Sequence, residues 1–284
     1  MSVFMFPGQG SQKKGMGGEL FARFPGEAAV ASRIVGYSME ALCQADTEGK
    51  LDNTRYTQPA LFTVNALHYL AMQEEGVSKP RYFIGHSLGE YNALHAAGAI
   101  DFATGVELTM LRGCLMSEAR KGGMAAVLGI GEQDIRAGLR EAQLDRVYVA
   151  NLNAPTQTVI SGETAQLHVA LQWLADRFGA ACVELNVSGA FHSPLMEEAR
   201  VEFGKRLATV AFRDPTTPVI ANIGARPYAA DGVRACLEQQ LTAPVRWTDT
   251  IRYLLDRGET EFIEVGPGRV LTQLLERIRR SAHV

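Results

Sequence analysis

The motif GHSLG at residues 85–89 constrains the fold of this chain more than any other segment. It matches the pattern G-x-S-x-G, in which a serine occupies a sharp turn between a strand and a helix. Residues 81–84 before it are typical of a short strand, and residues 90–99 after it are typical of a helix. Glycines on both sides of Ser87 allow a strained turn and close packing. With 28 glycines in the chain a chance match is conceivable, but the flanking elements favour a nucleophile elbow, which indicates covalent acyl chemistry.

Charge and cysteine usage exclude several classes of protein. A net charge of -3 and a pI near 6.1 give no attraction of the whole molecule to nucleic acid or to an anionic membrane. The apolar N-terminal run ends at Pro7, too soon for a signal peptide or a membrane span, so we expect neither export nor an anchor. The four cysteines are Cys43, Cys114, Cys182 and Cys236. They are too scattered for a clustered metal site and too few for a disulfide framework, so we expect a cytoplasmic protein with reduced thiols.

Strands and helices alternate along the first and last parts of the chain. Such alternation predicts an α/β fold, in which helices cover a mostly parallel sheet. We predict strands at 3–6, 81–84, 219–222 and 262–265, and helices at 59–75, 90–99, 102–121 and 269–280. Pro59 suits the first turn of its helix. The loop at 7–12 contains glycines that allow its backbone to approach another group closely.

The middle of the chain has a different order of elements. Residues 124–187 predict strand, helix, strand, strand, helix and strand, which is the order of a ferredoxin-like unit. We therefore expect a large catalytic lobe made of residues 1–123 and 188–284, with a small subdomain inserted at 124–187. The two lobes would form a cleft between them, which is a usual place for a substrate.

A nucleophilic serine needs a base, and histidine has the side-chain pKa nearest to neutral. The six histidines are His68, His86, His95, His168, His192 and His283. Three of them fall inside predicted helices, one lies in the C-terminal tail, and His86 adjoins Ser87, so its ring should point elsewhere. His192 remains, in a loop where the chain returns from the inserted subdomain. The alternative is a histidine in a surface loop.

A third member of a catalytic triad is harder to find. Most carboxylates between Ser87 and His192 belong to the inserted subdomain, and none is placed at a strand end of the main sheet. A backbone carbonyl can hold the outer ring nitrogen of a histidine and set its tautomer. We therefore expect a Ser–His dyad.

With these residues in place, the chain resembles malonyl-CoA:acyl carrier protein transacylases, including the discrete acyltransferases that serve polyketide synthases. The resemblance covers nearly the whole chain. Its motifs, in order, are FPGQGSQ at 6–12, GHSLGEY at 85–91, LRG at 111–113 with LM at 115–116, FHS at 191–193, PVRW at 244–247 and EVGPG at 264–268. It implies a large α/β-hydrolase-like lobe with an inserted ferredoxin-like one. The chain departs from the pattern at Ala243, where many members have asparagine.

The resemblance also implies roles for individual residues. Ser87 would be the nucleophile and His192 its base, and the backbone N–H groups of Gln9 and Leu88 would form the oxyanion hole. These last two assignments suit the chain, because Gln9 lies in a glycine-flanked loop and Leu88 directly follows the nucleophile. The carbonyl that orients His192 would be that of Arg246.

Two further residues would select the substrate. Arg112 lies in the predicted helix 102–121, where an arbitrary arginine belongs on a solvated face, but the resemblance assigns it to the free carboxylate of malonate. A guanidinium offers a carboxylate two parallel N–H bonds. Phe191 resembles the bulky residue of malonyl-specific members, which disfavours methylmalonyl, and the alternative is that Phe191 only packs. Gln58 is not expected to take part in the site.

These assignments predict a ping-pong transfer of malonyl from malonyl-CoA through Ser87 to the phosphopantetheine thiol of an acyl carrier protein. We expect a monomer without metal or redox cofactor, in polyketide or fatty acid synthesis. Carrier proteins are usually acidic, and Arg277, Arg279 and Arg280 form one candidate basic patch or, equally, a solvated helix end. The rival functions are an editing acyl-thioester hydrolase with the same dyad and a non-catalytic subunit that binds carrier proteins.

Overall fold

The computed structural model of the protein describes residues 2–119 and 122–282. Its α/β class, with a parallel main sheet and a separate antiparallel sheet, is the one predicted. The last residues of the helix predicted at 102–121, and His283, lie outside the described part of the chain.

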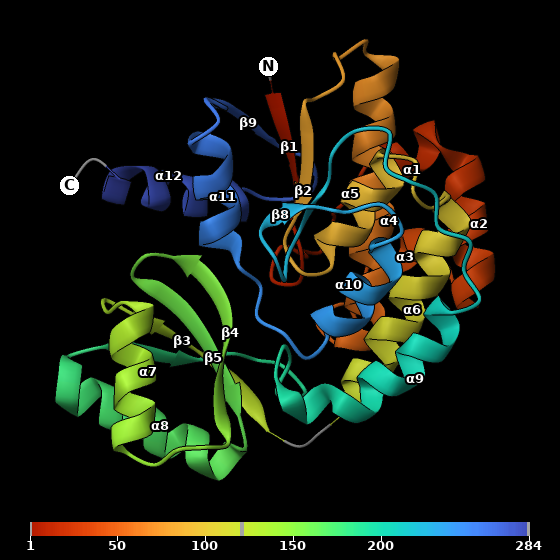
Figure 1. Ribbon diagram of the computed structural model, residues 1–284. Coiled ribbons are helices and arrows are strands. Elements are labelled where there is room, and N and C mark those ends of the chain that lie inside the picture. Colours follow the sequence, from red (N-terminus) through yellow and green to blue (C-terminus); the bar gives the residue numbers. More distant parts are fainter. Residues whose placement is uncertain (1, 120–121, 283–284) are drawn as a thin grey trace.

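Three parallel strands form the main sheet (Figure 1). β1 (Ser2–Phe6) lies in the middle, between β2 (Tyr82–Gly85) and β9 (Glu261–Glu264). Phe6 pairs with Gly85, so the loop after β1 and the turn after β2 leave the sheet at the same edge. This shared edge brings two of the sequence motifs together.

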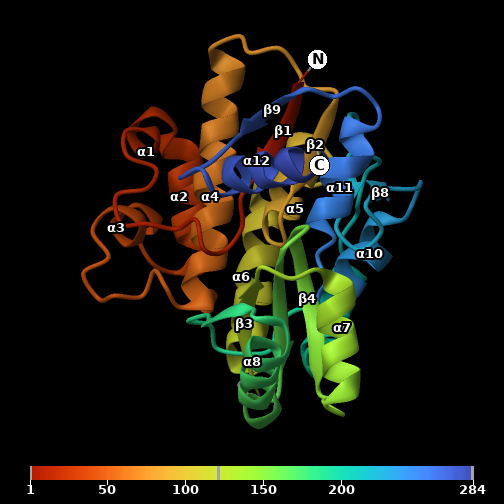
Figure 2. The ribbon, with the colours of Figure 1, turned by 90° about the vertical axis from the view of Figure 1, so that its left-hand side faces the viewer.

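Helices cover both faces of this sheet, as the alternating side chains of β1 require. Phe4 and Phe6 pack into the core that contains α4 (Thr54–Glu74), α5 (Gly89–Ala96) and α6 (Phe102–Glu118). Val3 and Met5 pack into a second core, made with α11 (Trp247–Leu255) and α12 (Val270–Ala282). Figures 1 and 2 show these two groups of helices on opposite sides of the strands. The turn that follows β2 is therefore supported by buried apolar contacts on both faces of the sheet.

The remaining elements of the large lobe were mostly not predicted from the sequence. They are α1 (Leu20–Arg23), α2 (Pro25–Val35), α3 (Met39–Gln44), a 3-10 helix at Pro194–Met196, α9 (Glu197–Leu207), β7 (Ile220–Ala221), β8 (Arg226–Pro227) and α10 (Val233–Gln240). The strand expected at 219–222 is represented by the short β7 and by a parallel bridge between Val219 and Phe83.

A four-stranded antiparallel sheet forms the small lobe. Its order is β4 (Val147–Ala154), β5 (Gln157–Gly162), β3 (Gly123–Leu128) and β6 (Ala181–Glu184). The two crossover helices, α7 (Glu132–Glu141) and α8 (Thr164–Phe178), pack on this sheet and share its apolar core. The element order is that of the expected ferredoxin-like unit.

The small sheet is joined to the large lobe at the edge of β4. Val245 donates its N–H to the carbonyl of Ala150 at 2.8 Å and accepts the N–H of Leu152 at 2.9 Å. The segment between α10 and α11 thus adds a parallel bridge to β4. This bridge holds the two lobes together beside the serine turn.

Helix α4 starts earlier than predicted. Asn53 caps it by accepting the N–H of Arg55 at 3.0 Å, so the helix begins at Thr54 and Pro59 lies inside it. The prediction failed because the cap, rather than the proline, sets the start. Helix α6 lies very close to α4, since a Cβ on Gly113 would come 2.8 Å from the carbonyl oxygen of Thr54.

Within residues 2–119 and 122–282, none of the helices is long and apolar enough to cross a bilayer. The four cysteines are free thiols, and no cluster of described side chains is suited to hold a metal ion.

Candidate active site

Ser87 occupies the turn between β2 and α5 in a left-handed backbone conformation, with φ of 51°. Such a φ is strained for a residue other than glycine, and its neighbours explain how the turn is tolerated. A Cβ on Gly85 would lie 2.0 Å from the backbone of Gly89, and a Cβ on Gly89 would lie 2.0 Å from the carbonyl oxygen of Phe6. The two motif glycines are therefore required by close backbone approach, as expected for a nucleophile elbow.

The side chain of Asn222, which directly follows β7, holds this turn in place. Its Oδ1 accepts the N–H of Ser87 at 2.7 Å, and its Nδ2 donates to the carbonyl of Gly85 at 2.7 Å. Both bonds are made by one side chain that is almost fully buried. Asn222 thus fixes the backbone on each side of His86 and compensates for the strained turn.

His192 lies against Ser87, as the sequence predicted. Its Nε2 is 2.7 Å from the Oγ of Ser87, and its Nδ1 is 2.9 Å from the carbonyl oxygen of Gln240 and 3.2 Å from that of Ala243. Carbonyls only accept hydrogen bonds, so they place the proton on Nδ1 and leave Nε2 free to accept the hydroxyl proton of Ser87.

Burial lowers the pKa of His192 to about 3, and the positive charge of Arg112 acts in the same direction. The ring is therefore neutral at physiological pH, which is the form that can take a proton. No carboxylate contacts the ring among its hydrogen bonds, so within the described residues the arrangement is a dyad held by backbone carbonyls.

The assignment of the orienting carbonyl to Arg246 is wrong. Arg246 caps α11, where its carbonyl accepts the N–H of Thr250 at 3.0 Å, while its own N–H donates to the carbonyl of Asn222. The carbonyls that reach His192 belong to Gln240 and Ala243, near the end of α10. A last turn of a helix has carbonyls without intrahelical partners, which leaves these free for the ring.

Arg112 is the largest polar side chain in the site and is only 1% exposed. Its Nη1 donates to Oε1 of Gln58 at 2.7 Å, and its Nη2 donates to Oε1 of Gln240 at 3.0 Å and to Oγ of Ser87 at 3.1 Å. Each of these partners is neutral. Burial accordingly lowers the pKa of the guanidinium, although arginine stays charged in proteins. The guanidinium beside Ser87 is thus buried and hydrogen-bonded to neutral groups, and the charge of Glu90 acts on it without a direct contact.

Gln58 therefore belongs to the site, against expectation. Its carbonyl oxygen orients Arg112, and Gly113 makes the contact possible because its missing side chain lets α6 approach α4 at this level. The sequence carried a weak signal, since Gln58 is a long polar residue directly before the largely apolar run of α4.

A second buried group, Glu90, lies behind the serine and was missed by sequence reasoning. Its carboxylate accepts hydrogen bonds from the side chains of Gln240 and Tyr228, and from the N–H of Asn222 at 3.1 Å. Burial raises the pKa of Glu90 to about 7, although these donors act in the opposite direction. Glu90 is the sixth residue of the motif GHSLGE, so its position next to the elbow was the available signal.

Gln240 connects these groups. Its side-chain amide bridges the carboxylate of Glu90 and the guanidinium of Arg112, and it also donates to the carbonyl of Ser87 at 3.0 Å. Its backbone carbonyl orients His192. No sequence motif pointed to Gln240, which is 153 residues from Ser87 along the chain.

Gln9 belongs to the loop after β1 and Leu88 to the turn after β2, which meet at one edge of the sheet. Gly8 packs against the elbow, because a Cβ there would be 2.4 Å from the carbonyl oxygen of His86 and 3.6 Å from the N atom of Leu88. The side chain of Gln9 is tied to Thr54 at 3.0 Å, which fixes the loop. Both Gln9 and Leu88 border the same cavity as Ser87.

That cavity has a volume of about 80 Å³ and is bordered by Ser87, His192 and Arg112. Phe191 is buried and forms part of its apolar wall, together with Met116 of α6. A small acyl group on the serine oxygen would therefore lie between an aromatic wall and a guanidinium.

His86 points away from the serine oxygen, as expected. Its Nε2 is 2.7 Å from Oδ1 of Asn153 on β4, and its ring lies against Trp247. It therefore links the elbow to the small lobe.

Comparison with known proteins gives consistent matches over the whole chain. The acyl transferase domain family matches residues 3–283. The malonyl CoA-acyl carrier protein transacylase BaeC of Bacillus velezensis, a polyketide biosynthesis protein, is 48% identical over 282 residues, which are 99% of this chain and 98% of BaeC. The polyketide biosynthesis protein ThaF of Burkholderia thailandensis is 50% identical over 278 residues, and there the match covers 98% of this chain but 24% of the relative.

Solved structures agree with the sequence matches. The crystal structure of a malonyl CoA-acyl carrier protein transacylase from Burkholderia pseudomallei has a TM-score of 0.95 and 47% identity, and the match covers 99% of this chain and 98% of that one. A malonyl-transacylase in complex with its type II PKS acyl carrier protein has a TM-score of 0.93 and 37% identity, covering 98% and 93%.

Proposed function

The chain belongs to the acyl transferase domain family, and we propose that it transfers malonyl from malonyl-CoA to the phosphopantetheine thiol of an acyl carrier protein. The observation that carries this proposal is the buried guanidinium of Arg112, held by neutral partners next to the serine oxygen. A buried charge without an anion in direct contact is costly, and an anionic substrate group bound to it would relieve that cost. Malonyl supplies such a group, whereas acetyl does not.

In the first half-reaction, His192 takes the hydroxyl proton of Ser87 through Nε2 while the serine oxygen attacks the thioester carbon. The 2.7 Å contact between these atoms and the neutral ring support this step. The bond to sulfur then breaks, and the protonated His192 returns its proton to the leaving thiolate. The product is a malonyl ester of Ser87 and free CoA.

The negative charge that develops on the carbonyl oxygen needs two donors. We assign these to the backbone N–H groups of Gln9 and Leu88, because both border the cavity and the glycine loop brings them together. Donors held in place before the reaction stabilise such an oxyanion without reorganisation.

The malonyl carboxylate is assigned to Arg112. A substituent on the serine oxygen necessarily lies next to the guanidinium, because Nη2 is 3.1 Å from Oγ before the reaction. The rigid support from Gln58 and Gln240 keeps the guanidinium in place for a two-bonded contact with the carboxylate.

In the second half-reaction, the thiol of the carrier protein replaces CoA. His192 takes the thiol proton, the thiolate attacks the malonyl ester, and the serine oxygen leaves with the proton from His192. The names of the relatives, several of which act in polyketide biosynthesis, support a carrier of that pathway.

We propose that the inserted residues 124–187 act as a separate subdomain that closes the cleft from one side.

Phe191 is proposed to limit the size of the acyl group. Its buried ring forms part of the cavity wall, where a methyl branch on malonyl would press. One methyl group in a pocket is worth roughly 1–3 kcal/mol, so Phe191→Ser should raise methylmalonyl transfer relative to malonyl transfer by about tenfold or more. An unchanged ratio in competition assays would assign Phe191 to packing alone.

The test of the function follows the malonyl ester. Wild-type enzyme and Ser87→Ala are mixed with malonyl-CoA, and the intact protein mass is followed with and without a holo carrier protein. We expect a malonyl adduct on the wild type only, which is stable in buffer and disappears when the carrier is added. Rapid loss of the adduct in buffer would indicate an acyl-thioester hydrolase, and absence of an adduct would indicate a non-catalytic binding protein.

A further inference from the structure

A groove of about 600 Å³ lies between the two lobes, beyond the acyl cavity. One wall consists of α7 and β4 of the small lobe, and the other includes His192, Pro194 and Pro244 of the large lobe. Figure 1 shows the small sheet beside the segment that joins α10 to α11. His192 is the only described residue that the groove shares with the acyl cavity.

The chemistry of the transfer indicates which part of the substrate would occupy the groove. Arg112 holds one end of the acyl group, and the thiolate that leaves or attacks must lie near Nε2 of His192 to exchange a proton with it. His192 borders both the acyl cavity and the groove. The arm that carries the sulfur therefore extends past His192 into the groove, toward α7.

Two arginines stand along the groove wall on α7. Arg136 and Arg140 are four residues apart and so lie on one face of the helix. The Nε of Arg136 contacts Glu132 at 2.7 Å in an exposed pair that contributes little. The guanidinium of Arg140 is exposed, and none of the ion pairs among the described residues includes it.

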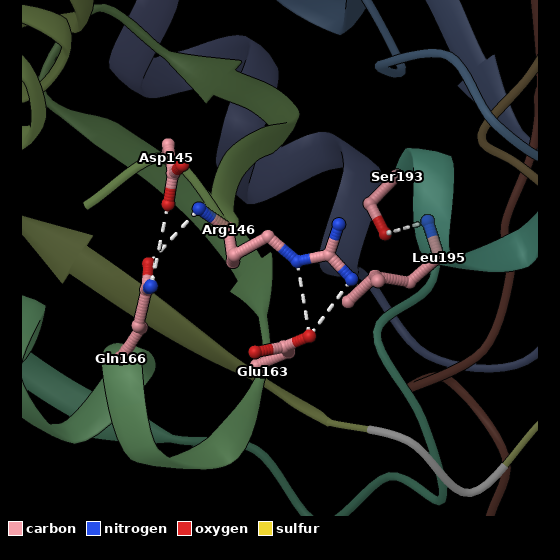
Figure 3. A network of polar contacts seen from close by, with 6 residues as sticks. All are labelled: Asp145, Arg146, Glu163, Gln166, Ser193 and Leu195. Atoms are coloured by element: carbon pink, nitrogen blue, oxygen red, sulfur yellow. Dashed lines mark hydrogen bonds and ion pairs between the residues drawn. The ribbon is translucent and has the colours of Figure 1, made fainter.

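Residues next to the groove make polar contacts of their own. Figure 3 shows that Asp145, which borders the groove, points to Gln166, and that Arg146 makes two hydrogen bonds to Glu163, at 3.0 and 2.8 Å. In the large lobe, Ser193 accepts the N–H of Leu195 at the start of the 3-10 helix, and the groove residue Pro194 lies between them in the sequence. Arg136 and Arg140 are the only arginine or lysine residues in the described lining of the groove, so its positive charge lies on α7.

We propose that Arg136 and Arg140 bind the phosphate at the far end of the pantetheine arm. The inference rests on the proposed function, because it uses the position of the sulfur at His192. A guanidinium recognises phosphate through charge-assisted hydrogen bonds. The phosphate is present both in CoA and in the modified serine of a carrier protein, so one site serves both half-reactions. Among the basic residues of the C-terminus, Arg277, Arg279 and Arg280 each contact another residue of the protein.

The test compares substrates that differ only in the phosphate. Formation of the malonyl enzyme is measured with malonyl-pantetheine, malonyl-phosphopantetheine and malonyl-CoA, for wild type and for the double variant Arg136→Gln, Arg140→Gln. The matched control is Arg33→Gln, Arg269→Gln, which removes two arginines elsewhere on the surface. Removal of the malonyl group by a holo carrier protein is measured for the same set of variants.

We expect kcat/KM of the α7 variant to fall about tenfold or more for both phosphorylated substrates and for the carrier protein, with malonyl-pantetheine and the control variant nearly unaffected. Added salt should reduce the advantage of the phosphorylated substrates in the wild type. An equal fall for malonyl-pantetheine would overturn the proposal, as would a fall confined to CoA or to the carrier protein. If the wild type forms no malonyl enzyme at all, the proposed function itself fails instead.

Discussion

The substitution Arg112→Ala tests how the site selects its substrate. It removes a guanidinium whose Nη2 is 3.1 Å from the serine oxygen and replaces it with a small apolar side chain. Malonyl and acetyl thioesters should respond differently, because only malonyl has a carboxylate for Arg112 to bind. The ratio of their transfer rates therefore isolates the bond between the guanidinium and the carboxylate.

The expected size of the effect follows from the hydrogen bonds that the guanidinium makes. A carboxylate bound through two charge-assisted hydrogen bonds, at about 1.5–3 kcal/mol each, is destabilised by about 3–6 kcal/mol when both are removed. At about 1.4 kcal/mol per factor of ten, kcat/KM for malonyl-CoA should fall by roughly 10² to 10⁴. Acetyl transfer reports the losses common to both substrates, which arise because Gln58 and Gln240 are each deprived of a hydrogen-bond donor.

The assay measures kcat/KM for malonyl-CoA and acetyl-CoA with the same carrier protein. Arg112→Lys provides the matched variant, since it keeps the charge but loses the planar fork, and it should lie between Ala and wild type. A second readout is the pH dependence of kcat/KM. Arg112 contributes to the low pKa of His192, so removal of Arg112 should raise that pKa and shift the acid limb of the profile to higher pH. Equal losses for malonyl and acetyl would refute the carboxylate contact.

Three further substitutions test the surroundings of the site. Glu90→Gln removes a carboxyl whose pKa in the folded protein, about 7, is above its ordinary value of 4.5. Between these two pH values the folded wild type keeps a proton on Glu90 that the unfolded chain has lost. The free energy of unfolding of the wild type should therefore decrease as pH rises from about 4.5 to 7, by at most about 1.4 kcal/mol per pH unit. The variant should lack this slope in urea titrations. Gly113→Ala should lower stability by about 1–3 kcal/mol, because its Cβ would meet the carbonyl oxygen of Thr54 at 2.8 Å; Gly26→Ala, where nothing lies within 4 Å, should be neutral or stabilising in the same thermal melts, and an equal loss at both positions would contradict this account. Asn222→Ala leaves the strained turn without its clamp, so kcat should fall more than KM changes in steady-state kinetics, whereas an unaltered kcat would show that the turn holds itself.

Local patterns carried most of the predictions that the structure bears out. The strand and helix around GHSLG and the loop at 7–12 depend on nearest neighbours, and their alternation with helices indicated the parallel sheet. The element order of the small lobe was also readable, because strands and helices have different hydrophobic periods. The starts of helices were predicted less accurately. The sequence predicts that α4 starts at Pro59, but the capping residue Asn53 lies earlier in the chain and the helix runs past the proline.

The GHSLG elbow, the α/β order and the small ferredoxin-like insertion were determined by the sequence, because turn geometry and periodicity are properties of short segments. The tertiary structure decided what surrounds Ser87. It showed that the carbonyls of Gln240 and Ala243, and not that of Arg246, orient the ring of His192. Every residue has a carbonyl, and only packing selects which one faces a ring. It also brought Gln58 to Arg112, because hydrogen bonds between residues far apart in the chain depend on how helices pack rather than on local sequence.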